Sequence, residues 1–213
     1  MPRPSTLPFL LVGCIGLALA GCVPAETRVL SFEDAFVQNP LMAQVVADQM
    51  IDFVTNLQIH ANERKQPIKD PRVLRTIDET FVRARAMLKK AYAEQDAGKK
   101  GSFLSFDDVF VKGEALLFGE SIFFGYDFEA DAVPGMRVIL AQHVGPKTSA
   151  ELRSQPTMDL GPLQSIIGPQ EYHVGTLSED EWNRYRTVAL YAPSLDRIIA
   201  YAQIRKHVAK EGE

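Results

Sequence analysis

The hydrophobic pattern of the chain changes its period near Ser102, and this change constrains the fold more than any other feature of the sequence. Before Ser102, apolar residues recur every three or four positions, as on one face of a helix. After it, apolar and polar residues alternate, as in half-buried strands. The pattern predicts an α+β protein, with an N-terminal antiparallel helical hairpin followed by an antiparallel β-sandwich of about seven strands.

Two matching signals mark where the helices of the hairpin begin. Asn39 and Asp70 are favourable N-cap residues, and a proline follows each of them. Proline is favoured at the first helical position, where no amide donor is needed. We therefore expect helices at about residues 40–64 and 71–96, within a hairpin that spans residues 39–98.

The apolar residues of both helices are separated by alternating steps of three and four, which is a heptad pattern. Because the helices match in length and their connection is short, we expect them to pack against each other along this seam. The charged outer faces are interpreted as a solvated surface, with contact to anionic lipid headgroups as the alternative. The expected seam consists of Ala43, Val46, Met50, Phe53 and Leu57 in the first helix, and Leu74, Ile77, Phe81, Ala84, Leu88 and Ala91 in the second.

The β-rich part of the chain extends over residues 102–206. Phe123 and Phe124 are adjacent and must face opposite sides of a strand, so we expect the hairpin to cover one side. Ser178 and Glu181 form a capping box that opens a short helix, which would bury Trp182. The expected strands lie at residues 103–106, 109–118, 121–129, 136–143, 171–174, 187–192 and 197–204.

The stretch 159–174 contains two Gly-Pro pairs that bracket a short apolar segment. Glycine permits unusual dihedral angles and proline fixes φ, so each pair predicts a chain reversal. The apolar side chains expected to be buried between the two reversals are Leu160, Leu163, Ile166 and Ile167.

The N-terminus has the features of a secretory signal. Arg3 precedes an apolar run at residues 7–20, which is shorter than the ~20 residues needed to span a bilayer. Small residues then precede Cys22. We expect cleavage before Cys22, which makes residues 1–21 a signal peptide and residues 22–38 an anchor linker with a short helix.

The sequence Leu19-Ala20-Gly21-Cys22 resembles the lipobox of bacterial lipoproteins at all four positions. The resemblance implies that Cys22 is acylated, with fatty acids such as palmitate, and that the mature chain is anchored by lipid in the cell envelope. Val23, in place of an aspartate, implies the outer membrane. A plain secretory signal with an incidental cysteine is the alternative.

A second resemblance covers about residues 102–205, and its most specific part is the stretch 159–172. Its motifs are Asp127-Phe128, Pro134-Gly135, Val138, Leu140, Asp159-Leu160-Gly161-Pro162-Leu163, Ile167-Gly168, Gln170, Tyr172, Tyr185-Arg186-Thr187-Val188 and Ala202-Gln203-Ile204. These residues resemble the DM-thirteen domain, a small β-sandwich module of bacterial lipoproteins that also occurs beside DOMON domains in animal extracellular proteins.

The DM-thirteen family has been proposed to act in electron transfer, largely because of a cysteine near the end of its penultimate strand. The matching position in this sequence is Ala192. The resemblance therefore implies the fold of the family but gives no support to a redox role that depends on that thiol.

Charge and motifs argue against several classes of function. A formal net charge of −4, with bases scattered among acids, does not suit a nucleic-acid surface. The sequence has no G-x-S-x-G elbow, P-loop or G-x-G-x-x-G motif. We therefore expect no catalytic residue, no cofactor and no nucleic-acid partner.

The histidines and acids predict no metal or acid–base site. His143 and His173 would meet only if their strands paired, and exposed or hydrogen-bonded histidines are the simpler interpretation. The adjacent acids at 107 and 108 point to opposite faces, and Asp127 and Glu129 lie on the expected solvent face.

These observations favour a lipid-anchored envelope protein with a non-catalytic binding or interaction domain. Its expected partners are the membrane, through the lipid on Cys22, and a protein or small ligand. The alternative is an electron-transfer domain, or one that carries a redox ligand. A scaffold whose hairpin self-associates is a third possibility.

Overall fold

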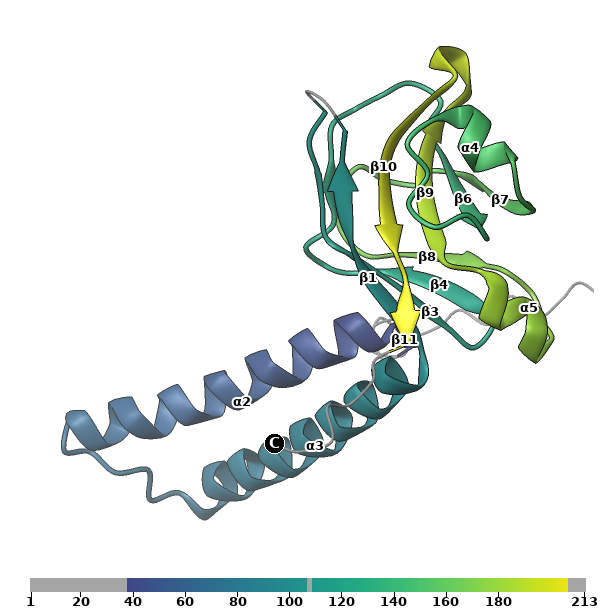
Figure 1. The fold of residues 1–213 in the computed structure, drawn as a ribbon. Helices are drawn as coiled ribbons and strands as arrows, with labels where there is room; N and C mark the ends of the chain where they lie inside the picture. The colour runs from purple at the N-terminus through teal and green to yellow at the C-terminus, as the bar shows by residue number, and fades with distance from the viewer. Residues whose placement is uncertain (1–37, 107–108, 207–213) are drawn as a thin grey trace, which may run out of the picture. The chain divides into compact units, whose positions relative to one another are not determined.

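A computed structural model describes residues 38–106 and 109–206 of the chain (Figure 1). The predicted signal peptide, Cys22 and nearly all of the predicted linker lie outside the described residues. The described part begins with two long helices, α2 (Pro40–Glu63) and α3 (Pro71–Ala97), and continues into a region rich in strands.

Both predicted helix starts are confirmed. The Asn39 side chain accepts hydrogen bonds from the amides of Leu41 and Met42, and the Asp70 side chain accepts one from Arg72. The helix α3 ends at Gly98, directly before the first strand. A Cβ atom at Gly98 would come within 2.8 Å of the Leu117 carbonyl oxygen, so this close approach requires glycine.

The two helices lie side by side (Figure 1), but the seam between them differs from the predicted one in α2. Phe53, expected in the seam, is 68% exposed and Leu57 is 38% exposed. In α3 the prediction is confirmed in its central part and wrong at Leu74, which is 40% exposed. The buried positions along the hairpin are Ala43, Ala47 and Val54 in α2 and Ile77, Ala84 and Ala91 in α3.

Side-chain size explains the altered seam. The spacing of α2 supports two neighbouring apolar stripes, one with small residues and one with large residues. Alanine at the contact lets two helices approach closely, because the interaxial distance depends on the side chains between them. The small stripe is therefore buried, and the large stripe is half-buried at Val46 and Met50 and exposed at Phe53 and Leu57.

The strands follow α3 with short connections and two further short α-helices, α4 (Ser149–Arg153) and α5 (Glu179–Arg184). The strands are β1 (Lys99–Ser105), β2 (Val111–Lys112), β3 (Glu114–Phe118), β4 (Ser121–Phe124), β5 (Glu129–Ala130), β6 (Arg137–Ala141), β7 (Thr157–Pro162), β8 (Gln170–His173), β9 (Thr187–Ala192), β10 (Arg197–Gln203) and β11 (Arg205–Lys206).

Within the described residues, one antiparallel sheet of nine strands has the order β7-β6-β9-β10-β1-β3-β4-β8, with β11 paired to β1. The strand β1 joins the two halves of this sheet. Its first residues pair with β3, whereas Phe103, Leu104 and Ser105 pair with β10. The α+β class is thus confirmed, and the strands number more than the seven or so expected because short strands were merged or missed.

Side chains from both halves of the sheet form one main core. Three phenylalanines lie at its centre, and the ring centroid of Phe103 is 5.1 Å from that of Phe124 and 5.5 Å from that of Phe128. These edge-on contacts are favourable arrangements for aromatic pairs. The aliphatic residues around them include Ile122, Val138, Leu140, Val188 and Leu190.

The predicted strand 121–129 is interrupted at Gly125, and Tyr126 is 56% exposed. The expectation for Phe123 and Phe124 is confirmed. Phe124 lies in the main core, whereas Phe123 on the opposite face packs with Leu41 at the start of α2. The hairpin therefore covers part of the outer face of β4.

The predictions for the stretch 159–174 are partly wrong. Gly161 lies in β7 at a bulge opposite β6, where a chain reversal was expected, and Ile166 and Ile167 are 43% and 63% exposed. Hydrogen bonds, rather than apolar burial, hold this segment. The buried Gln170 side chain accepts from the Ser165 amide and from the Tyr172 hydroxyl, at 3.1 Å and 2.7 Å.

The predicted capping box is confirmed, since the Ser178 hydroxyl accepts from the Glu181 amide and the Glu181 carboxylate accepts from the Ser178 amide. Trp182 is only half-buried against the main core. The helix α5 is six residues long and has no fully buried residue.

Two buried amides attach the hairpin to the sheet and to itself. The Asn39 side chain donates to the Phe124 carbonyl oxygen at 3.0 Å. The Gln95 side chain donates to the Pro40 carbonyl oxygen at 3.2 Å and to the Gln44 side chain at 2.9 Å. The base of the hairpin therefore has a defined position on β4.

Replacing Asn39 with alanine is expected to destabilise the protein more than replacing Asp70 with alanine. Both changes remove a helix cap, at a cost of about 1 kcal/mol. Asn39→Ala also removes the buried hydrogen bond to the Phe124 carbonyl oxygen, which contributes about 0.5–1.5 kcal/mol. Denaturant unfolding of both variants measures the difference, and equal losses would contradict the attachment role of Asn39.

Candidate binding groove

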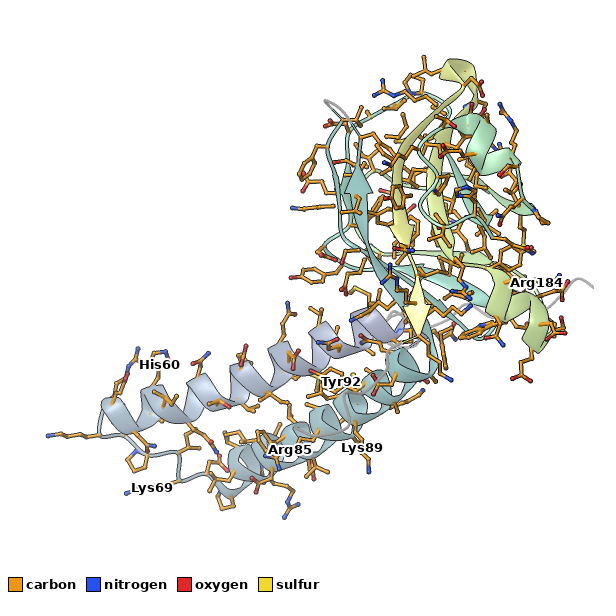
Figure 2. The ribbon with its side chains drawn as sticks, in the orientation of Figure 1. His60, Lys69, Arg85, Lys89, Tyr92 and Arg184 are labelled. Atoms are coloured by element: carbon orange, nitrogen blue, oxygen red, sulfur yellow. The ribbon has the colours of Figure 1, made fainter. Side chains whose placement is uncertain are left out.

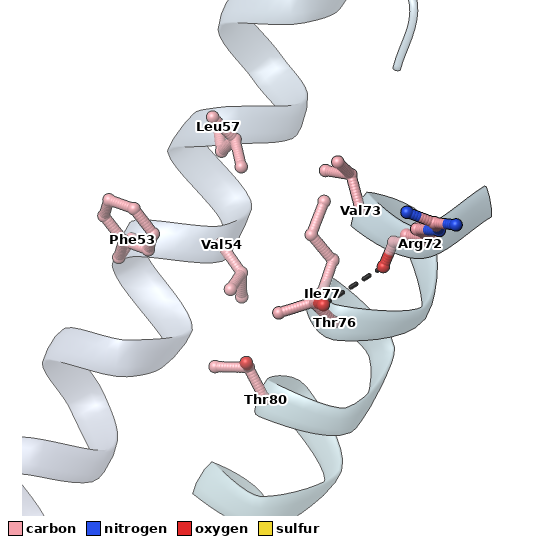
Figure 3. Close-up of a pocket in the computed structure, with 8 residues that line it drawn as sticks. All are labelled: Phe53, Val54, Leu57, Arg72, Val73, Thr76, Ile77 and Thr80. Carbon is pink, nitrogen blue, oxygen red and sulfur yellow. Dashed lines mark hydrogen bonds between the residues drawn. The ribbon is translucent and has the colours of Figure 1, made fainter. Parts of the chain in front are cut away.

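A groove of about 260 Å³ lies between the C-terminal half of α2 and the first turns of α3 (Figure 3). Phe53, the first lining residue, lies thirteen residues after Pro40, which is about 20 Å along the helix axis. The groove is therefore remote from the end of α2 that contacts the sheet. Its lining residues are Phe53, Val54, Leu57, Arg72, Val73, Thr76, Ile77 and Thr80.

The sequence forms this groove because the buried stripe is narrow. Val54 and Ile77 are 3% and 5% exposed and belong to the contact between the helices. Phe53, Leu57 and Val73 flank this contact and stay exposed. The open part of the groove is therefore apolar.

One hydroxyl group at the groove already has a partner within its own helix. The Thr76 hydroxyl donates to the Arg72 carbonyl oxygen of its own helix at 3.0 Å, as drawn in Figure 3. An apolar group that entered the groove would therefore strip little water from this hydroxyl. The Arg72 guanidinium, in contrast, is exposed at the groove.

Five cationic side chains lie close together in sequence around the turn that joins α2 to α3, where Figure 2 shows Lys69. Among the described residues, these five cations have no ion-pair partner, and each is exposed. Of the nearby acids, Glu63 contacts His60 at 3.2 Å and Asp70 caps α3. The cations are Arg64, Lys65, Lys69, Arg72 and Arg75.

This arrangement combines an apolar groove with unpaired positive charge at its edge. Pockets that bind ligands are mostly apolar, with a few polar or charged groups that fix orientation. The groove thus suits an apolar group that carries, or lies beside, negative charge. Sequence reasoning missed the groove because it placed Phe53 and Leu57 inside the hairpin.

A second cavity, of about 530 Å³, lies near the base of the hairpin. Its charged groups are partly engaged, since Lys100 Nζ lies 3.3 Å from the Gln95 side chain and 3.6 Å from the Glu114 carboxylate. It is the weaker candidate. Its lining residues are Gln44, Tyr92, Gln95, Asp96, Lys100, Arg205 and Lys206.

The structure does not bring His143 and His173 together on paired strands. The expectation of exposed or hydrogen-bonded histidines is not met at His143, whose Nδ1 atom is buried without a hydrogen-bond partner among the described residues. The strand β6 ends at Ala141, before His143, and β6 is not adjacent to β8, which contains His173. No group of three potential metal ligands occurs within residues 38–106 and 109–206. Glu129 pairs with Lys112 at 2.7 Å across β5 and β2.

Lys99 is a buried charged residue that sequence reasoning missed. Its Nζ donates to the carbonyl oxygens of Trp182 and Tyr185, the latter at 3.0 Å, and lies 4.3 Å from the centre of the Trp182 ring. Burial and the nearby Arg186 lower the pKa of Lys99 to about 8. The burial of Lys99 could have been predicted from the sequence, because Lys99 shares a strand face with Phe103, four residues later.

The contacts of Lys99 indicate a structural role. Lysines of lowered pKa are common at functional sites, but structural contacts also lower the pKa. Here both hydrogen bonds end on the backbone at the end of α5, so Lys99 fastens α5 to β1. No cavity described above includes Lys99 among its lining residues.

An exposed cluster closes the turn between β9 and β10. Asp196 adopts a left-handed conformation with φ of 45°, and its carboxylate accepts from Arg153 at 2.9 Å and from the Tyr191 hydroxyl at 2.6 Å. The hydrogen bonds from Arg153 and then Tyr191 lower the pKa of Asp196 to about 2. This ion pair stabilises the turn that follows Ala192 and has no catalytic geometry.

Comparison with known proteins identifies no family for this chain, because no family model, no curated protein and no solved structure matches it. In the part of the chain that the structure describes, none of the helices combines the length and the apolar character required to cross a membrane.

The lowered pKa of Lys99 predicts how stability depends on pH. Between pH 8 and 10.5 the unfolded chain holds this proton more tightly than the folded chain does, so stability should rise with pH in that range. Lys99→Met should remove this rise, whereas Lys90→Met, at an exposed lysine, should retain it. Urea unfolding at several pH values tests the slope; an unchanged slope in Lys99→Met would refute the assignment.

Proposed function

We propose that this protein is a lipid-anchored protein of the cell envelope, most simply of the outer membrane, with a non-catalytic binding domain. The observation that carries the binding role is the open apolar groove at Phe53, Leu57 and Val73 with unpaired cations around it. The lipobox ending at Cys22 supports the anchor. The partner is a protein or a small amphiphilic ligand.

We further propose that the strand region is a β-sandwich related to the DM-thirteen domain. Support comes from the shared core, in which residues of β3, β4 and β8 pack with residues of β6, β9 and β10. The strand β1, paired to both halves, would be the strand that passes from one layer to the other. The quoted motifs around 159–172 support the family relationship.

The electron-transfer alternative remains a prediction that no specific contact favours. Ala192, at the position of the cysteine of the DM-thirteen family, is fully buried, and its methyl group belongs to the main core. A methyl group has no redox chemistry. A redox function would therefore require a bound group rather than a side chain at this position.

The lipid anchor is tested by replacing Cys22. Full-length chain should be recovered in the membrane fraction of a bacterial host and carry acyl groups on its N-terminal peptide. Cys22→Ala should lose both the acyl groups and the membrane recovery. Cys14→Ala, a matched change inside the predicted signal peptide, should alter neither. An acyl-free wild-type N-terminus would overturn the anchor.

Absorption spectra separate the binding role from the redox alternative. If the domain is a non-catalytic binding module, protein purified from the envelope of its own host is expected to show no visible absorption band. A band that persists through purification and weakens in His143→Ala or His173→Ala would instead support a redox ligand.

A further inference from the structure

We propose that the turn end of the hairpin binds the surface of an anionic phospholipid bilayer, with Phe53 and Leu57 inserted below the headgroups. This contact extends the proposed function and is separate from the lipid on Cys22. It gives the groove a definite occupant, the acyl chains and headgroups of membrane lipids. Its basis is the combination of apolar exposure and local charge.

The apolar component is a continuous stripe on α2. Val46, Met50, Phe53 and Leu57 follow one another at steps of four, three and four, so they share one face of the helix. Val46 and Met50 are half-buried, whereas Phe53 and Leu57, nearer the turn, are exposed. Phe53 is 68% exposed and Leu57 38%, and Val73 of α3, on the same groove, is 40% exposed.

The charge component is concentrated at the turn. Residues 59–75 contain five basic side chains, Arg64, Lys65, Lys69, Arg72 and Arg75, and two acids, which gives a net charge of +3. The whole chain has a net charge of −4, so the remaining residues sum to −7. The turn is therefore a basic segment of a chain that is acidic overall.

Arg72 connects the two components, because its side chain lines the same groove as Phe53 and Leu57. A long basic side chain beside apolar residues is typical of interfacial sites, where the aliphatic stem contacts acyl chains and the charge stays with the headgroups. Each lysine or arginine near an anionic surface strengthens binding by roughly fivefold. The five cations thus supply attraction, and the apolar stripe supplies insertion.

The chain between Cys22 and Asn39 is long enough for both membrane contacts to occur together. Its seventeen residues reach at most about 60 Å when extended. The helix α2 has 24 residues and is about 36 Å long. The hairpin turn can therefore reach the same bilayer as the lipid on Cys22.

Quenching of tryptophan fluorescence by brominated lipids tests the contact in the full-length chain. Trp182 is the only tryptophan, so Trp182→Phe combined with Phe53→Trp places a single reporter in the groove. A matched reporter, Val82→Trp with Trp182→Phe, replaces a residue that is also 68% exposed. Val82 lies two residues beyond Thr80, about 200° around the helix from the groove.

In vesicles of phosphatidylcholine with phosphatidylglycerol, the reporter at position 53 should be quenched several-fold and the one at position 82 should not. Quenching should fall in vesicles of phosphatidylcholine alone, and in the charge-reversal variant Lys65→Glu/Lys69→Glu. Hydrogen exchange of the unsubstituted chain gives a second readout, with added protection over residues 53–75 only when anionic lipid is present.

Several outcomes would overturn the proposal. One is an unquenched reporter at position 53 in anionic vesicles. Another is protection of residue 53 from hydrogen exchange in the absence of lipid, together with a doubled native mass of the protein. This result would identify a second copy of the chain as the occupant. Failure of the anchor is recognised separately, because it appears in the mass of the N-terminal peptide and not in the signal at position 53.

Discussion

The side-chain amide of Asn39 is the interaction on which the arrangement of the described residues depends. Its oxygen starts α2 by accepting from Leu41 and Met42, while its nitrogen donates to the carbonyl oxygen of Phe124. One buried side chain thus determines both where the hairpin begins and where it meets β4. Leu41 then covers Phe123, so the polar attachment is enclosed by apolar contacts. Aspartate or serine would cap the helix equally well, but neither has the amide that donates to β4.

Local signals in the sequence were sufficient for the starts of the helices and insufficient for how the elements pack. The caps at Asn39, Asp70 and Ser178 depend on neighbouring residues, and all three were predicted. The choice between two apolar stripes on α2 depends on how closely α3 approaches, which no local pattern contains. The groove was missed for the same reason. Buried polar groups such as Gln170 and Lys99 were also missed, because their partners are distant backbone groups.

The proposed function follows from what the hairpin leaves uncovered. A hairpin that buried its largest apolar residues would offer only a charged surface to other molecules. Here the buried stripe is small, and the larger stripe lies next to a turn with unpaired cations. The strand region contributes a closed core and an attachment point, and its described polar clusters, at Lys99 and at Asp196, are engaged in stabilising the fold.

The alanine contact between α2 and α3 also has a mechanical consequence. Two helices held together at contacts such as Ala47 and Ala84 resist bending more than one helix does, because each restrains the other at these contacts. The base of this pair is tied to β4 by the hydrogen bond from Asn39. A force applied at the hairpin turn would therefore be transmitted along the paired helices to their attachment on β4.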